Sequence, residues 1–164
     1  MPRNIKILDR QCFASGVTII EQGSESNRAY IIESGKVEVF LKDVEGKDMQ
    51  ISQLGAGALI GEIGLINDAK RVASVKTLEP TVLVSISSYD FKDAMTKSKE
   101  FKDSVMSKAK RRIKETIGVI DEQTQPNKML KSTDRAEILL IRDTLSNSLN
   151  SITKKLKKEI DYPK

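Results

Sequence analysis

Short apolar runs alternate with polar, often glycine-containing turns through the first half of the chain. Between Lys36 and Leu41, aliphatic residues occupy every second position, which is the period of a strand with one buried face. Five other runs have a similar length and composition. The six predicted strands are Val17–Ile20, Ala29–Ile32, Lys36–Leu41, Met49–Leu54, Val72–Lys76 and Val82–Ile86. Short strands at such spacing predict a mainly β fold, an antiparallel jelly-roll barrel that can enclose a small ligand.

The second half of the chain has the longer period of amphipathic helices. Ser87 and Ser88, followed by Asp90, predict the capped start of a short helix. Residues 98–120 repeat apolar positions at helical spacing and predict a longer helix. Its apolar positions are Phe101, Val105, Ala109, Ile113, Ile117 and Ile120. At the other end of the chain, residues 1–10 are interpreted as part of a helix that packs on the barrel.

A linker and a final helix complete the predicted organisation. Residues 121–133 contain a proline and few large apolar side chains, which indicates a linker. Asp134, with Glu137 three residues later, is typical of a capped helix start. Apolar residues then recur about every 3.7 positions, which favours a nearly straight amphipathic helix lying on its own domain, a second copy or another protein. The chain is thus predicted to comprise a domain (1–120), the linker and a C-terminal helix (134–164).

Charge is distributed unevenly along the chain. Residues 1–91 carry 10 Lys and Arg against 12 Asp and Glu, a net charge of −2, whereas residues 92–164 carry 18 against 11, a net charge of +7. This basic excess is compatible with nucleic acid, with an acidic partner, or with ordinary solvated helix faces. No apolar run approaches the ~18 residues that a membrane span needs, and the N-terminus lacks the apolar core of a signal peptide. The single cysteine, Cys12, fits a reducing compartment, so a cytoplasmic location is expected.

Composition also argues against catalysis. The chain has no histidine, which is the commonest general base and metal ligand. No pairing of a nucleophile with a base, no cluster of metal ligands and no pair of catalytic carboxylates stands out in the sequence. We therefore expect a binding protein rather than an enzyme, without a catalytic cofactor or metal.

The most distinctive stretch, Ile60–Ser74, concentrates groups suited to a sugar phosphate. Gly61 and Gly64 lack Cβ atoms and would let the backbone approach a ligand closely. Glu62 is an acceptor for hydroxyl groups, whereas Arg71 offers a planar, permanently charged fork for phosphate oxygens. The turn between them is expected to start a short helix, whose free N–H groups also favour a phosphate. The alternative interpretation is that Glu62 and Arg71 form an ion pair that braces a loop.

This stretch resembles the phosphate-binding cassette of the cyclic nucleotide-binding domain family, as found in catabolite activator protein and the regulatory subunits of cAMP-dependent kinase. The family pattern is Phe-Gly-Glu-(Leu/Ile)-Ala-Leu, a short loop, and then Arg-Ala-Ala or a close variant. The matching residues are Gly61, Glu62, Ile63, Leu65, Arg71 and Ala73. Ile60 and Gly64 stand where the family commonly has Phe and Ala. Other matching segments, which extend the resemblance to roughly residues 12–120, are Ile19–Gly23, Tyr30–Ile32, Gly35–Val39, Leu54–Gly57 and Ser87–Phe91.

The resemblance implies roles for particular residues. Glu62 would bind the ribose 2′-hydroxyl and Arg71 the cyclic phosphate, assisted by backbone N–H groups of four neighbours. Those neighbours are Ile63, Gly64, Val72 and Ala73. Val39 and Ile51 match the wall of the family's base pocket, although a role in the core explains them equally well. With Gly61, these nine residues form the predicted ligand site, and the helix of residues 98–120 corresponds to the family's lid and frequent dimer seam.

The residue after the arginine bears on the choice of nucleotide. The resemblance implies that cGMP-selective members of the family have a threonine at this position. Its hydroxyl forms a hydrogen bond with the guanine amino group. Here it is Val72, which offers no hydrogen bond. A site without that polar group cannot form a hydrogen bond with the guanine amino group, so cAMP is the expected ligand and cGMP the less favoured one.

The predicted function is a receptor in which cyclic nucleotide binding rearranges the C-terminal helices, and through them acts on a protein partner or a second copy. DNA binding by the family's helix-turn-helix is not expected, because no glycine follows Gly118 to form the turn of that motif. Two alternatives stay open. One is a transcriptional regulator whose basic C-terminal helices bind DNA in another way, and the other is a ligand-free interaction module on the same scaffold.

Overall fold

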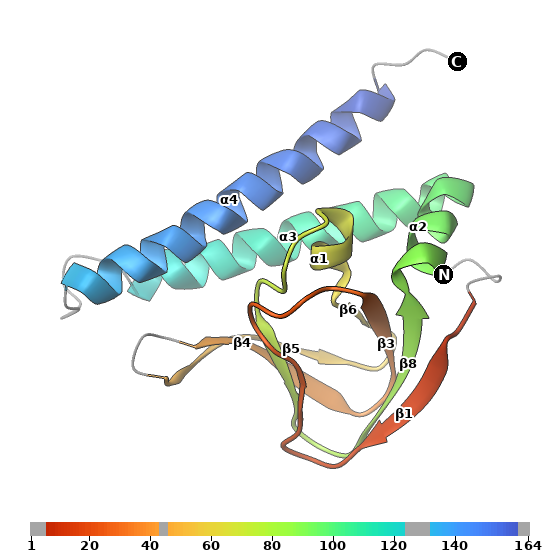
Figure 1. Cartoon of the computed structure of the whole chain (residues 1–164), viewed down its shortest axis with the longest axis horizontal. Helices are drawn as coiled ribbons and strands as arrows, with labels where there is room; N and C mark the ends of the chain where they lie inside the picture. Colours follow the sequence, from red (N-terminus) through yellow and green to blue (C-terminus); the bar gives the residue numbers. More distant parts are fainter. Residues whose placement is uncertain (1–5, 43–45, 124–131, 161–164) are drawn as a thin grey trace.

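The computed structural model describes residues 6–42, 46–123 and 132–160, where the strands form two four-stranded sheets (Figure 1). The first sheet contains, in spatial order, β1 (Asp9–Phe13), β8 (Thr81–Ser87), β3 (Arg28–Ser34) and β6 (Leu59–Ile60). The second contains β2 (Thr18–Ile20), β7 (Ser74–Thr77), β4 (Lys36–Lys42) and β5 (Asp48–Gly55). Every pairing is antiparallel, and the sheets pack face to face. The predicted jelly-roll fold is confirmed.

Aliphatic side chains from both sheets fill the space between them. The buried residues of this cluster are Ile20, Ile32, Val37, Ile60, Val75 and Leu83. Strands β4 and β5 form the predicted hairpin, in which Val37 lies opposite Leu54 and Val39 opposite Ser52. The turn before β4 requires glycine, because Gly35 has a φ of +100° and a Cβ there would clash with the backbone of Thr81. The hairpin and β7 thereby provide one wall of the cavity described below.

In the described ranges, four helices follow or interrupt the strands. They are α1 (Glu62–Ile66), α2 (Ser88–Lys97), α3 (Lys99–Gln123) and α4 (Ser132–Ile160). The capped start of α2 is confirmed, since Asp90 N donates a hydrogen bond to Ser87 Oγ at 3.1 Å. Phe91 of α2 and Phe101 of α3 meet edge to face, with 6.1 Å between ring centroids, inside a second buried cluster that joins the helices to the barrel. None of these helices is both long and apolar enough to cross a membrane.

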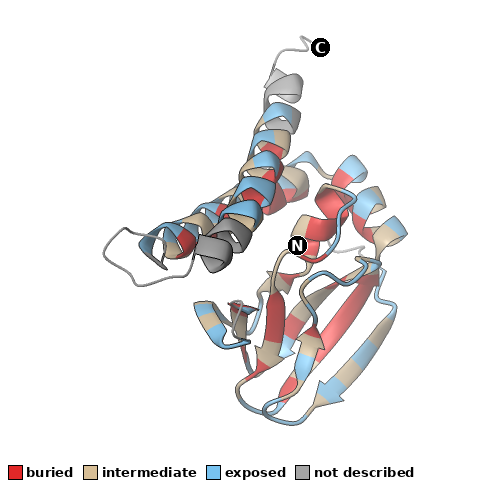
Figure 2. Ribbon diagram, turned by 60° about the vertical axis from the view of Figure 1, so that its left-hand side comes forward, coloured by how far each residue is buried: buried red, intermediate tan, exposed pale blue. Residues whose placement is uncertain are grey.

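Helix α4 lies alongside α3 and runs in the opposite direction (Figure 1). Leu145 and Ile152 of α4 are fully buried in the cluster that contains α3, and Arg142 Nε donates a hydrogen bond to Asp121 Oδ1 at 2.5 Å. Figure 2 shows how buried residues line the inner sides of the sheets and helices, while the outer positions are exposed. Of the three surfaces considered for this helix, the structure therefore places it on its own chain. Three of its predicted apolar positions have side chains outside the described part: Ile138, Leu156 and Ile160.

The structure corrects the sequence predictions at the N-terminus and around the linker. The N-terminal helix is wrong within residues 6–10, because residues 6–8 are neither helix nor strand and Asp9 begins β1; residues 1–5 lie outside the described part. Strand β1 was missed because only two of its five residues are apolar, and its pairing with the distant β8 stabilises it instead. The helix boundaries around the predicted linker differ by two or three residues, since α3 continues to Gln123 and α4 begins at Ser132.

Candidate functional site

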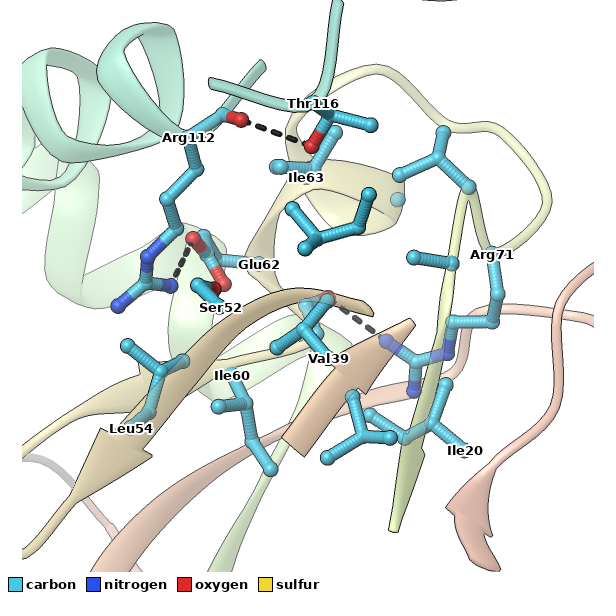
Figure 3. Close-up of a pocket in the computed structure, with 16 residues that line it drawn as sticks. Ile20, Val39, Ser52, Leu54, Ile60, Glu62, Ile63, Arg71, Arg112 and Thr116 are labelled. Atoms are coloured by element: carbon cyan, nitrogen blue, oxygen red, sulfur yellow. Dashed lines mark hydrogen bonds and ion pairs between the residues drawn. The ribbon is translucent and has the colours of Figure 1, made fainter. Parts of the chain in front are cut away.

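A cavity of about 70 Å³ lies between the second sheet, α1 and α3, and it is named here the barrel cavity (Figure 3). All nine residues of the predicted ligand site line it: Val39, Ile51, Gly61, Glu62, Ile63, Gly64, Arg71, Val72 and Ala73. The other lining residues are Ile20, Ser52, Leu54, Ile60, Val75, Arg112 and Thr116. Most of the wall is aliphatic, so the few polar groups decide what the cavity can recognise.

Glu62, the first residue of α1, is held by the long helix α3. Its side chain is buried, and Arg112 Nη1 donates a charge-assisted hydrogen bond to Glu62 Oε1 at 2.5 Å. The same nitrogen donates to the carbonyl oxygen of Leu59, the first residue of the preceding strand β6. Arg112 therefore ties α3 to the corner at which the chain passes from β6 into α1.

Arg71 is held by main-chain groups of the barrel. Its guanidinium donates hydrogen bonds through Nη1 to Gly61 O at 2.7 Å and through Nη2 to Arg28 O at 2.6 Å. Its own backbone is fixed as well, because Arg71 N donates to Ser24 O at 2.9 Å and Gly23 N donates to Arg71 O at 2.8 Å. The side chain and the backbone of Arg71 are thus positioned by the same part of the barrel.

Glu62 and Arg71 have different partners, so the interpretation that they brace a loop by pairing with each other is wrong for this structure. Burial lowers the pKa of Arg71, while the nearby carboxylate of Glu62 opposes that change. An arginine nevertheless stays protonated at physiological pH. The cavity therefore contains a buried cation that an anionic ligand would stabilise.

Two glycines shape the α1 end of the cavity. Gly61 caps the start of α1 with a left-handed conformation (φ +80°), and a Cβ there would clash with Arg71 Nη1. Gly64 has no such backbone requirement, but a Cβ on it would clash with Ser26 Oγ. The side chain of Ser26 thus occupies the space that an alanine at position 64 would need.

Sequence reasoning missed three polar residues of the cavity: Ser52, Arg112 and Thr116. Arg112 and Thr116 point from α3 toward the barrel, and Thr116 Oγ1 donates to Arg112 O at 2.9 Å (Figure 3). A signal was present, because the two residues are four apart and lie on the same side of the helix as buried Ala109 and Ile120. It was obscured by the other basic residues of α3, of which Lys99, Lys108, Arg111 and Lys114 are exposed.

Comparison with known proteins identifies the family. The family model for the cyclic nucleotide-binding domain matches residues 10–98. A cAMP-dependent protein kinase regulatory subunit from Mucor circinelloides f. lusitanicus is 40% identical over 68 residues, which are 42% of this chain and 16% of that protein. The cAMP-activated global transcriptional regulator CRP from Salmonella typhimurium is 32% identical over 105 residues, 63% of this chain and 50% of the regulator. This chain thus spans half or less of the length of these relatives.

The fold has a solved counterpart as well. The co-crystal structure of the regulatory domain of Toxoplasma gondii PKA with cAMP superposes with a TM-score of 0.55 at 25% identity, over 61% of this chain and 38% of that one. The match extends the agreement from sequence to the arrangement of strands and helices.

Proposed function

The chain belongs to the cyclic nucleotide-binding domain family, and we propose on this premise that it is a cytoplasmic receptor for a cyclic nucleotide, preferably cAMP. One observation carries the proposal. A buried carboxylate and a buried guanidinium, predicted separately as the sugar and phosphate ligands, line one cavity together with the seven other predicted residues. The receptor would act through its helices and would have no catalytic activity of its own.

Glu62 and Arg71 would bind opposite ends of the ribose phosphate. The carboxylate of Glu62 is acceptor-only and suits the 2′-hydroxyl. Of the five N–H donors of a guanidinium, Arg71 commits two nitrogens to the carbonyls of Gly61 and Arg28, which leaves donors for a phosphate. No side chain caps the start of α1, so backbone N–H groups at Ile63 and nearby would assist.

The cavity must widen to hold a nucleotide. Its volume of about 70 Å³ is well below the roughly 300–1,000 Å³ of small-molecule sites. The wall most suited to move is α3, because only two of the lining residues, Arg112 and Thr116, belong to it. Binding would therefore select an arrangement in which α3 has shifted, which is the population shift expected of a switch.

The hydroxyl of Thr116 supports adenine over guanine. Its proton is engaged with Arg112 O, so toward a ligand the hydroxyl oxygen is an acceptor. Adenine presents an exocyclic amino donor, whereas guanine presents a carbonyl acceptor at the corresponding ring position. Together with the missing hydroxyl at Val72, this favours cAMP.

The output would be made by the α3–α4 pair. Because α4 packs on α3 through Leu145 and Ile152, a shift of α3 would weaken or rearrange this packing. The apolar face of α4 exposed in this way would suit a protein partner or a second copy of this chain. DNA is the less favoured partner, since nothing in the described helices forms a reading motif.

Calorimetric titration with cAMP and with cGMP tests the proposal. Arg71→Ala removes a charge-assisted contact and is expected to weaken binding by about 1.5–3 kcal/mol, and Glu62→Ala is expected to weaken it comparably. Arg10→Ala and Glu33→Ala are matched controls, because these residues form an exposed ion pair outside the cavity and should leave affinity unchanged. Absence of saturable binding by folded, nucleotide-free protein would refute the receptor and leave the interaction-module alternative.

A further inference from the structure

A second cavity adjoins the ion pair between Arg112 and Glu62 and is named here the α3 pocket. Strands β3 and β6 contribute Ile31 and Leu59 to its wall, and α3 contributes Arg112 and the two preceding turns. Its volume is about 70 Å³, several times the roughly 10–15 Å³ that a single buried water needs. Glu62 and Arg112 line the barrel cavity as well, so the two cavities meet at this ion pair.

Three polar side chains of α3 line the pocket in a column. Ser104, Lys108 and Arg112 follow one another at intervals of four residues, which places them along one side of the helix. Ser104 and Lys108 are exposed, so they stand at the mouth of the pocket. Within the described residues, the hydroxyl of Ser104 and the ammonium of Lys108 have no hydrogen bond or ion pair. Both groups are therefore available to a ligand.

The guanidinium of Arg112 is engaged on one side only. Its Nη1 donates to Glu62 and to Leu59 O, whereas Nε is buried without a partner and Nη2 makes no hydrogen bond in the described part of the chain. In Figure 3 this guanidinium lies beside Glu62, on the side away from Arg71. Nε and Nη2 together form the edge of an arginine that can hold a carboxylate through two parallel hydrogen bonds. A buried N–H without a partner is unfavourable, so a ligand that accepts from this edge would be stabilised.

We propose that the α3 pocket binds the carboxylate of a small organic acid, for which acetate is the model. A carboxylate that reaches Nη2 of Arg112 from the pocket would accept from Nε as well after a small rotation of the guanidinium. The charges of Glu62 and Arg112 offset each other, so Lys108 leaves the lining with one net positive charge, which suits a monoanion. Half-buried Ile31 and Leu59 would contact a short aliphatic group, and the volume admits a ligand of only a few non-hydrogen atoms.

The carboxylate would also favour nucleotide binding, a consequence that rests on the proposed function. A shift of α3 would separate Arg112 from Glu62 and leave the guanidinium without its partner. Because Ser104, Lys108 and Arg112 all belong to α3, a carboxylate bound to them would move with the helix and replace Glu62 as that partner. Acetate should therefore raise the affinity for cAMP by about fivefold, and cAMP should raise the affinity for acetate by the same factor.

NMR of the arginine Nε–H groups of the full chain, titrated with acetate at constant ionic strength, tests the site. The Nε–H signal of Arg112 should move downfield in a saturable manner, because it gains a hydrogen bond. That of Arg142, whose Nε already donates to Asp121, should stay in place. Lys108→Gln should weaken acetate binding about threefold to fivefold by removing one ion pair. Lys114→Gln is the control, because Lys114 is an exposed lysine of the same helix outside the pocket and its replacement changes the net charge equally.

The outcomes separate the two proposals. An unmoved Arg112 signal, or equal weakening by Lys108→Gln and Lys114→Gln, would overturn the site. A shift of the Arg71 signal in place of that of Arg112 would overturn it too, because acetate would then occupy the barrel cavity. A saturable Arg112 shift with the expected charge dependence would support the site even in a protein that fails to bind cAMP, which would refute only the proposed receptor. In a protein that binds both ligands, an unchanged cAMP affinity at saturating acetate would overturn the regulatory step.

Discussion

Glu62 and Arg71, the two charged residues of the predicted ligand site, are held by different parts of the molecule. Arg71 is fixed by main-chain groups of the barrel. Its side chain is hydrogen-bonded to Gly61 and Arg28, and its backbone to Ser24 and Gly23. Glu62 instead depends on one side chain from α3, that of Arg112. The half of the cavity proposed for the phosphate is thus built by the barrel alone, whereas the half proposed for the sugar is completed by a helix.

This difference indicates where a signal would pass. A shift of α3 changes the surroundings of Glu62 directly and leaves those of Arg71 intact. A nucleotide that bridges both residues would therefore bind tightly in only one arrangement of α3, which is the condition for coupling binding to conformation. Substitutions in each half of the cavity test this contrast.

Arg112→Met should produce the largest loss of stability. It leaves the buried carboxylate of Glu62 without its ion-pair partner, and breaking a buried pair in this way costs about 3–5 kcal/mol. Because the side chain of Arg112 retains 16% exposure, the lower end of that range is expected. The free energy of unfolding from chemical denaturation measures the effect.

The neighbouring Arg111 provides the control for this prediction. Its side chain is 68% exposed and its contact with Glu115 is loose, at 3.9 Å. Arg111→Met should therefore change stability by less than about 0.5 kcal/mol. Equal effects of the two substitutions would show that the tie between α3 and Glu62 contributes nothing beyond the loss of an arginine.

Gly61→Ala should disturb the half of the cavity around Arg71, which the barrel alone builds. The substitution places a Cβ at a φ of +80° and against Arg71 Nη1, so we expect a loss of about 2 kcal/mol in the free energy of unfolding. Gly16→Ala is a matched control, because Gly16 has a φ of +81° and open space around its Cβ position. It should lose only the ~1 kcal/mol due to the backbone conformation. A loss at Gly61 no larger than at Gly16 would mean that Arg71 moves aside freely.

The contrast between the two halves also explains what could be predicted from the sequence. Every group that fixes Arg71 lies in the barrel, and the spacing of Gly61, Glu62 and Arg71 within one short stretch identified the cassette. The partner of Glu62 lies 50 residues away on another helix, and only its place on the apolar side of that helix distinguishes Arg112 from the neighbouring Arg111. Local motifs and periodicity thus predicted the jelly roll, and long-range side-chain pairing required the structure.

Position 64 shows a similar limit. The sequence shows a glycine where the family commonly has alanine, but the reason is the side chain of Ser26, which is distant in sequence. Gly64→Ala should therefore destabilise the protein by about 1–2 kcal/mol through overpacking. Ser26→Gly in the same chain should recover most of that loss, because it removes the clashing atoms. Additive losses in the double variant would contradict this pairing, and Ser26→Gly alone supplies the reference.

Thr116→Val should have the smallest effect, and a selective one. Valine keeps the shape of threonine but removes the acceptor offered to an adenine amino group, so cAMP affinity should fall about fivefold, or roughly 1 kcal/mol. Affinity for cGMP should change by less than about twofold, which narrows the preference between the nucleotides. Thr144→Val is the control, since Thr144 Oγ1 makes the same hydrogen bond to the carbonyl four residues earlier on α4, away from the barrel cavity. Equal losses for both nucleotides would place the effect of Thr116 in the packing of α3 against the barrel and not in recognition of the base.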